Sequence, residues 1–176
     1  MFRPFACLAL VALATTAQAG TFRLRVDAAD AQGHIATRYS YDRFGCSGAN
    51  VAPAVHWDGA PAGTRSFALT VFDPDAPTGS GFWHWVVIDL PASAHGLAEG
   101  GRLPPPARAV RNDYGDKAWG GPCPPAGDPP HHYVFTVYAL DVPALGVPAD
   151  ASPALTGFML RSHVLGKAQQ TLTFGR

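Results

Sequence analysis

Residues 66–90 read SFALTVFDPDAPTGSGFWHWVVIDL, in which two apolar runs flank a turn rich in Pro and Gly. The runs at 66–72 and 83–90 are apolar on both faces of an extended chain, which is typical of the central strands of a sheet. A tight connection between them predicts an antiparallel pair. Asp73 ends the first run and His84 opens the second, so this pairing predicts that both side chains lie at the same end of the sheet.

Further strand signals surround this pair. Residues 132–140, HYVFTVYAL, have the strongest strand composition in the chain because Tyr, Val, Phe and Thr dominate them. Phe22, Leu24 and Val26 alternate with arginines, which predicts a half-buried strand. Shorter strands are expected at 54–57 and 171–174. Between residues 90 and 114, where Gly, Pro and Ala dominate, we expect mostly irregular chain with room for a short helix.

Only the segment near residues 153–169 indicates a helix. Ser152 is a suitable N-cap, Pro153 suits the first turn, and apolar residues follow at approximately helical spacing. A parallel sheet needs more crossover helices than this pattern offers. The chain therefore predicts a mainly β-fold with antiparallel pairing and a helix lying against the sheet.

The amino terminus has the pattern of a secretory signal. Arg3 is basic, residues 5–16 are apolar but too few to span a bilayer, and Ala17-Gln18-Ala19 has the small-x-small pattern of a cleavage site. We predict a signal peptide over 1–19, a single domain over 20–176, and a periplasmic or secreted location. The alternative is that 1–19 forms a buried first strand or helix.

Charge and cysteine content limit the partners and suggest a cross-link. The formal net charge is +0, which argues against a nucleic-acid partner, and no second segment predicts a transmembrane helix. The mature chain keeps Cys46 and Cys123. An oxidising compartment favours a disulfide between them. Two separate thiols are the alternative, because a sequence does not show whether two Cβ atoms approach.

A candidate site follows from the strand ends. His131 opens the third strong strand, and if that strand runs in the same direction as 83–90, Asp73, His84 and His131 share one rim. Imidazoles donate hydrogen bonds and carry charge near neutral pH. The turn at Gly120 and Gly121 can expose backbone N–H groups. Together these groups predict a small pocket for an oxyanion or phosphate.

Aromatic side chains supply candidate walls for this pocket. Trp83, Trp85 and Tyr114 are the expected walls, with Tyr133 supporting them, and Trp83 and Trp85 would share one face of a regular strand. Each of these residues also has an ordinary structural interpretation, because aromatic stripes usually belong to a core and Asp-Pro usually begins a turn. The combination of motifs favours a site more than any single residue does.

Catalytic and metal-binding alternatives have weaker signals. Two histidines and one aspartate match the ligands of a facial-triad iron site or a zinc site, but no HxxxH or HxD pair fixes a local geometry. A GxSxG elbow and a phosphate-binding P-loop are also absent from the sequence. We therefore predict neither a metal nor a cofactor. A metal- or histidine-assisted hydrolase of phosphoesters or esters is the alternative function.

The quoted motifs resemble those of the phosphatidylethanolamine-binding protein family, in its bacterial Raf-kinase-inhibitor-like (YbhB/YbcL-like) branch. The resemblance extends over essentially the whole mature chain. The segments that carry it are DPDAP at 73–77, WHW at 83–85, GPCPPAG at 121–127 followed by HHY at 131–133, FGCSGAN at 44–50, and HVL at 163–165.

The resemblance implies a fold and a set of site residues. The fold is two antiparallel sheets with a small number of peripheral helices. The site is an anion pocket that accepts phosphate, acetate or a phosphoethanolamine-like head group. By motif position the ligand-binding residues are Asp73, His84, His131, Tyr133, Gly120 and Pro122, and we add Trp83 as an expected wall of the pocket.

The functional expectation is an exported, non-catalytic binding protein. Its ligand would be a small anion or phosphoryl head group, and it would act as an inhibitor or regulator of a partner protein that the sequence does not identify. The sequence leaves the oligomeric state open, a homodimer included.

Overall fold

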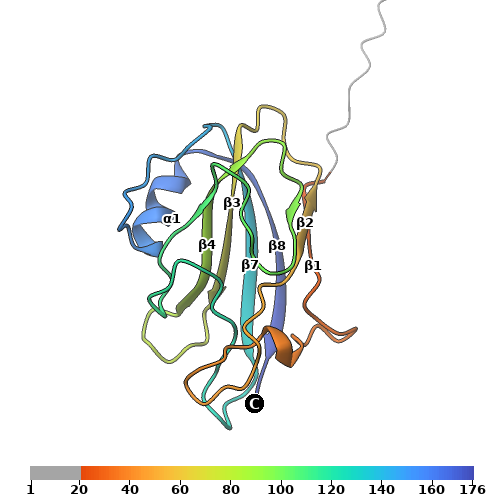
Figure 1. The fold of residues 1–176 in the computed structure, drawn as a ribbon. Helices are drawn as coiled ribbons and strands as arrows, with labels where there is room; N and C mark the ends of the chain where they lie inside the picture. The colour runs from red at the N-terminus through yellow and green to blue at the C-terminus, as the bar shows by residue number, and fades with distance from the viewer. Residues whose placement is uncertain (1–20) are drawn as a thin grey trace, which may run out of the picture.

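The computed structural model describes residues 21–176, so the predicted signal peptide over 1–19 lies outside the described residues. Two antiparallel sheets form the domain (Figure 1). The smaller sheet has the order β1 (Arg23–Val26), β2 (Val55–Asp58), β5 (Gly96–Leu97). The larger sheet has the order β6 (Arg108–Ala109), β4 (Phe82–Pro91), β3 (Ser66–Asp73), β7 (His131–Leu140), β8 (Val164–Phe174). The predicted fold class is confirmed.

The larger sheet is built around the antiparallel pair β3 and β4. β3 lies between β4 and β7, is antiparallel to both, and is buried along nearly all of its length. Its apolar side chains pack into two hydrophobic cores, one on each face of the sheet. One core lies between the sheets and includes Trp57, Trp85 and Phe135. The other lies on the opposite face and includes Ile88 and Leu160.

Helical structure is sparse in the described part of the chain. A short 3-10 turn, η1 (Thr37–Tyr39), and the helix α1 (Pro153–Arg161) lie at the edges of the domain, and α1 covers one side of the larger sheet (Figure 1). The predicted N-cap is confirmed, because the Ser152 side chain accepts a hydrogen bond from the backbone N–H of Leu155 at 3.1 Å. Between residues 90 and 114 only β5 and β6 form, each two residues long.

The predicted helix over 153–169 is too long. α1 ends at Arg161, and from Val164 the chain forms β8, which pairs with β7 along its whole length. The helical stripe in this segment was therefore misleading. Ala168 turns inward while Lys167 and Gln169 point outward, which is the two-residue period of a strand. Pairing with the free edge of β7 satisfies backbone groups that a helix would satisfy internally, so tertiary context overrides local propensity.

The strand predicted at 171–174 is the last part of β8. None of the helices in residues 21–176 combines the length and apolarity that a bilayer crossing needs.

Candidate functional site

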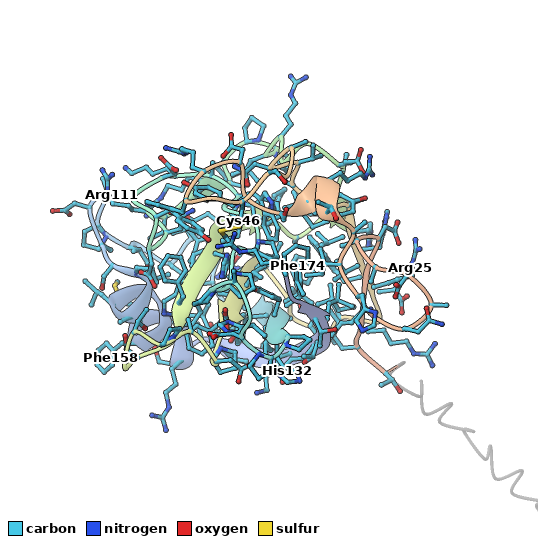
Figure 2. The ribbon with its side chains drawn as sticks, turned by 90° about the horizontal axis from the view of Figure 1, so that it is seen from below. Arg25, Cys46, Arg111, His132, Phe158 and Phe174 are labelled. Atoms are coloured by element: carbon cyan, nitrogen blue, oxygen red, sulfur yellow. A yellow bond between two sulfur atoms is a disulfide. The ribbon has the colours of Figure 1, made fainter. Side chains whose placement is uncertain are left out.

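A pocket lies at the end of the larger sheet where β3 ends and β7 begins. Its volume is about 330 Å³. The three predicted polar residues line it: Asp73 is the last residue of β3, His84 is the third of β4, and His131 is the first of β7. This end of the sheet carries the C-terminus in Figure 1, and Figure 2 looks onto it, with Cys46, His132 and Phe174 labelled around it.

A β-bulge in β4 determines which of its side chains face the pocket. Val71 pairs with Trp85 and Phe72 pairs with Trp83, so His84 is an extra residue between two successive pairs. A bulge of this kind re-aims the side chains beside it. The side chains of His84 and Trp85 therefore lie on the same face of the sheet, the face toward the core between the sheets. In a regular strand these two neighbours would point to opposite faces.

The bulge also corrects the prediction that Trp83 and Trp85 share one face. Trp83 packs on the ring of Phe72 at 4.4 Å, next to the core under α1, and it is not among the residues that line the pocket. Trp85 is buried in the other core, against Trp119 at 5.8 Å, and does not line the pocket either. Of the predicted aromatic walls only Tyr114 takes that position.

Asp73 and His131 form a buried pair. Nδ1 of His131 lies 2.8 Å from Oδ2 of Asp73, and the two residues are 4% and 3% exposed. The other carboxylate oxygen of Asp73 accepts the backbone N–H groups of Asp75 at 2.8 Å and Ala76 at 3.1 Å. Asp73 therefore orients the imidazole and also closes the turn that its Asp-Pro sequence suggested.

His84 is held by the loop that follows Trp119. Its Nδ1 lies 2.7 Å from the carbonyl oxygen of Gly120, and because a carbonyl only accepts, this nitrogen carries the hydrogen. Its Nε2 is buried and has no hydrogen-bond partner among residues 21–176. Burial lowers the pKa of His84 to about 4, so the imidazole is neutral at physiological pH.

Two tyrosines, Tyr133 and Tyr114, pack against the His84 ring in edge-to-face arrangements. Tyr133 packs edge-on against His84 at 5.1 Å, and its hydroxyl is buried without a hydrogen-bond partner among the described residues. Burial raises the pKa of Tyr133, with a smaller contribution from the Asp73 carboxylate, so its hydroxyl keeps its proton. Tyr114 donates its hydroxyl hydrogen to the carbonyl of Gly121 at 3.1 Å, and burial raises its pKa too.

The Gly120–Gly121 turn does not offer free N–H groups, contrary to the sequence expectation. The N–H of Gly120 donates to the carbonyl of His84 at 3.0 Å, and the N–H of Gly121 donates to the side-chain oxygen of Asn50 at 2.8 Å. A Cβ at Gly120 would lie 2.3 Å from the Tyr114 ring, and one at Gly121 would lie 2.1 Å from the carbonyl oxygen of Tyr39. These glycines permit close packing that fixes the His84 ring.

Pro122 belongs to the same loop and helps to fix its conformation. It is buried, its carbonyl accepts the backbone N–H of Tyr41 at 3.0 Å, and it is not among the residues that line the pocket. Its contribution to the site is to hold the turn that carries Gly120.

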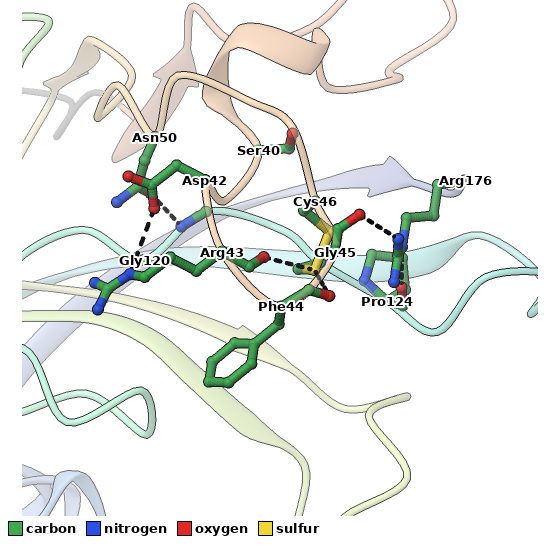
Figure 3. Close-up of a disulfide and its surroundings, with 12 residues drawn as sticks. Ser40, Asp42, Arg43, Phe44, Gly45, Cys46, Asn50, Gly120, Pro124 and Arg176 are labelled. Carbon is green, nitrogen blue, oxygen red and sulfur yellow. Dashed lines mark hydrogen bonds and ion pairs between the residues drawn. A yellow bond between two sulfur atoms is a disulfide. The ribbon is translucent and has the colours of Figure 1, made fainter.

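The predicted disulfide between Cys46 and Cys123 is present, with the Cα atoms 5.9 Å apart (Figure 3). It joins the loop at 42–46 to the loop after Gly121, and Arg176 adds hydrogen bonds to the carbonyl oxygens of Gly45 at 2.8 Å and Pro124 at 2.7 Å. Phe44, two residues from the bridge, lines the pocket and is 73% exposed, so the cross-link holds an aromatic side chain at the mouth.

The pocket also contains residues that the sequence analysis did not assign to the site: Phe44, Phe82 and Asp113. Phe44 opens the FGCSGAN motif and Phe82 stands directly before the WHW motif, so their place in or beside a motif was their only sequence signal. The charge balance is informative. The lining residues include two aspartates and two histidines, and none is Lys or Arg.

In residues 21–176 there is no group of three or more His, Cys, Asp or Glu side chains placed to hold a metal ion. The hydrolase alternative stays a prediction.

Replacing Tyr133 with Phe tests whether the Tyr133 hydroxyl contributes to the stability of the fold. Because the hydroxyl has no partner, we expect the free energy of unfolding to stay within about 1 kcal/mol of wild type or to rise. Tyr114→Phe is the matched control, since it removes a hydroxyl that donates to Gly121, and it should cost about 1 kcal/mol. Urea denaturation of both variants measures the difference, and a larger loss in Tyr133→Phe than in Tyr114→Phe would contradict the assignment.

Two antiparallel sheets, with a small pocket at one end of the larger sheet, define a β-protein whose site is built from three strand termini and three loops. The chain belongs to the phosphatidylethanolamine-binding protein family, whose model matches residues 26–175. The resemblance inferred from the motifs is thereby confirmed.

Relatives in Escherichia coli K12 are similar over most of the chain. The UPF0098 protein YbcL is 43% identical over 162 residues, covering 89% of this chain and 88% of its own. The UPF0098 protein YbhB is 42% identical over 142 residues, covering 78% of this chain and 89% of its own. The crystal structure of E. coli YbcL, described as a new member of the mammalian PEBP family, matches with a TM-score of 0.85 and 41% identity, covering 89% of this chain and 99% of that one.

Proposed function

We propose that this protein is a non-catalytic binding protein that holds a small phosphorylated or otherwise acidic ligand in the pocket formed by Asp73, His84 and His131. The observation that carries the proposal is Nε2 of His84, a buried nitrogen without a hydrogen-bond partner among residues 21–176, in a side chain that lines the pocket. A buried polar group without a partner costs about 1–3 kcal/mol, so this nitrogen favours a ligand that supplies the missing bond.

The rigidity of the walls supports binding. The pocket lies between a disulfide and loops that contain Pro77, Pro124 and Pro125, so little conformational freedom is lost when a ligand enters. Membership of a family described as phosphatidylethanolamine-binding supports a phosphoryl head group as the ligand class.

We also propose that the protein is exported. The signal-like pattern over 1–19 and the disulfide both support an oxidising compartment, the periplasm or the outside of the cell. Action on a partner protein as an inhibitor or regulator stays a prediction.

The test is a titration of the ¹⁵N-labelled protein with O-phosphoethanolamine, followed by NMR. We expect saturable shifts in the amides around Asp73, His84 and His131. The variant His131→Ala should weaken binding at least about tenfold, because it removes a buried group that lines the pocket.

His132→Ala is the matched control, since this neighbouring histidine is exposed and pairs with Asp75 outside the pocket. Its affinity should equal that of wild type, and thermal unfolding of both variants should show that they are folded. The proposal fails if wild-type protein shows no saturable shifts at millimolar O-phosphoethanolamine.

A further inference from the structure

The direction of one hydrogen bond determines what His84 can offer to a ligand. Nδ1 must donate to the Gly120 carbonyl, so in the neutral ring Nε2 carries a lone pair and accepts. This nitrogen is buried and unpartnered among residues 21–176, in a side chain that lines the pocket. His84 therefore presents an acceptor to the ligand, where a fully ionised anion would need a donor.

His131 also uses its inner nitrogen within the protein. Its Nδ1 donates to the Asp73 carboxylate at 2.8 Å, and its Nε2 lies 3.7 Å from the Asp128 carboxylate. The unpartnered acceptor in the pocket is therefore Nε2 of His84.

The groups that surround His84 in residues 21–176 include no lysine or arginine to replace a donor. They are Asp73 from β3, His131 and Tyr133 from β7, and Asp113 and Tyr114 from the loop after β6. Of the residues that line the pocket in the described chain, none is Lys or Arg. A dianion would enter a pocket that already holds carboxylates and would face an unmatched lone pair, and both effects are unfavourable in a buried site.

We propose that the pocket binds its acidic ligand together with one proton: a monoprotonated phosphate or phosphonate group whose acidic hydrogen lies between a ligand oxygen and Nε2 of His84. This inference rests on the proposed function and names the ionisation state that the site selects. Tyr133 packs edge-on against the His84 ring at 5.1 Å and helps to hold it, but it is not among the residues that line the pocket.

The proton comes from solvent. The free His84 ring does not supply it, because burial lowers its pKa to about 4. A phosphate monoester with a second pKa of about 6 is mostly dianionic at pH 8, so each binding event there takes up one proton from the buffer. By linkage, the affinity should fall about tenfold for each pH unit above about 6.

The experiment compares methyl phosphate with methyl sulfate by isothermal titration calorimetry. Near pH 5.5 both are monoanions of similar shape, but only methyl phosphate carries an acidic hydrogen. We expect methyl phosphate to bind about ten- to a hundredfold more tightly, because methyl sulfate leaves the His84 lone pair unmatched. At pH 8, titrations in two buffers of different ionisation enthalpy should report uptake of about one proton per methyl phosphate.

A spectroscopic measurement on the wild-type protein makes the test independent of any variant. The ¹⁵N shift of Nε2 in His84 should be that of an unprotonated nitrogen in the free protein and should move toward the protonated value in the complex. Methyl phosphate affinity that does not change between pH 6 and 8, or equal binding of methyl sulfate, would overturn the inference and leave the proposed function standing. If neither compound binds, the proposed function fails as well.

Discussion

Loss of the Cys46–Cys123 disulfide is expected to lower the free energy of unfolding by about 4 kcal/mol. The two cysteines are 77 residues apart, so the bridge removes a large loop-closure entropy from the unfolded chain. The double variant Cys46→Ser with Cys123→Ser should therefore unfold at a clearly lower urea concentration than wild type. The same variant should bind methyl phosphate more weakly, because Cys123 and the nearby Phe44 both line the pocket.

Reductant provides the control for this experiment. Adding it should destabilise wild type by a similar amount and leave the double variant unchanged, since the variant has no bridge to break. A loss of less than about 1 kcal/mol in both comparisons would show that the bridge contributes little and that Arg176, through Gly45 and Pro124, holds the two loops together.

Acid is expected to destabilise the protein through His84 before most carboxylates titrate. An imidazole exposed in the unfolded chain has a pKa of 6.5, whereas burial lowers the pKa of His84 in the folded protein to about 4. Below pH 6.5 the unfolded chain takes up a proton that the folded protein does not, so stability falls as the pH falls. The total loss between these two values is on the order of 3 kcal/mol.

Urea denaturation at intervals between pH 4 and 7.5 measures this loss. His84→Asn should flatten the slope between pH 6.5 and 4, because the amide does not titrate and its nitrogen can still donate toward Gly120. His95→Asn, at an exposed position, is the matched control and should keep the wild-type slope. An unchanged slope in His84→Asn would mean that another group causes the acid sensitivity.

The fold was predictable because its strongest signals are local. The apolar runs in β3, β4 and β7 exceed what an edge strand would carry, and the short turn between the first two requires antiparallel pairing. β8 was less predictable. Its residues 164–170 fit an apolar stripe as well as a strand, and only the free edge of β7 decides between them.

Part of the site was predictable for the same reason. Asp73 and His84 stand at the ends of strands whose directions follow from the turn, so their proximity was predictable. His131 joins them because β7 pairs antiparallel with β3, which the sequence left as a condition. The face of the sheet on which Trp83 lies was not predictable from the sequence. A bulge adds one residue to β4 and so changes which side chains point to each face, and the sequence shows no signal for this bulge.

The sequence by itself determined the central strands, the antiparallel pairing of β3 with β4, the family, and the placement of Asp73 and His84 at one rim, because each depends on local periodicity or on motifs with fixed spacing. Only the tertiary structure decided the chemistry of the rim. The carbonyl of Gly120 fixes the His84 tautomer, and the N–H groups expected to hold an anion are used inside the protein. Hydrogen-bond direction and burial depend on which distant segments meet, and residue type alone does not specify either.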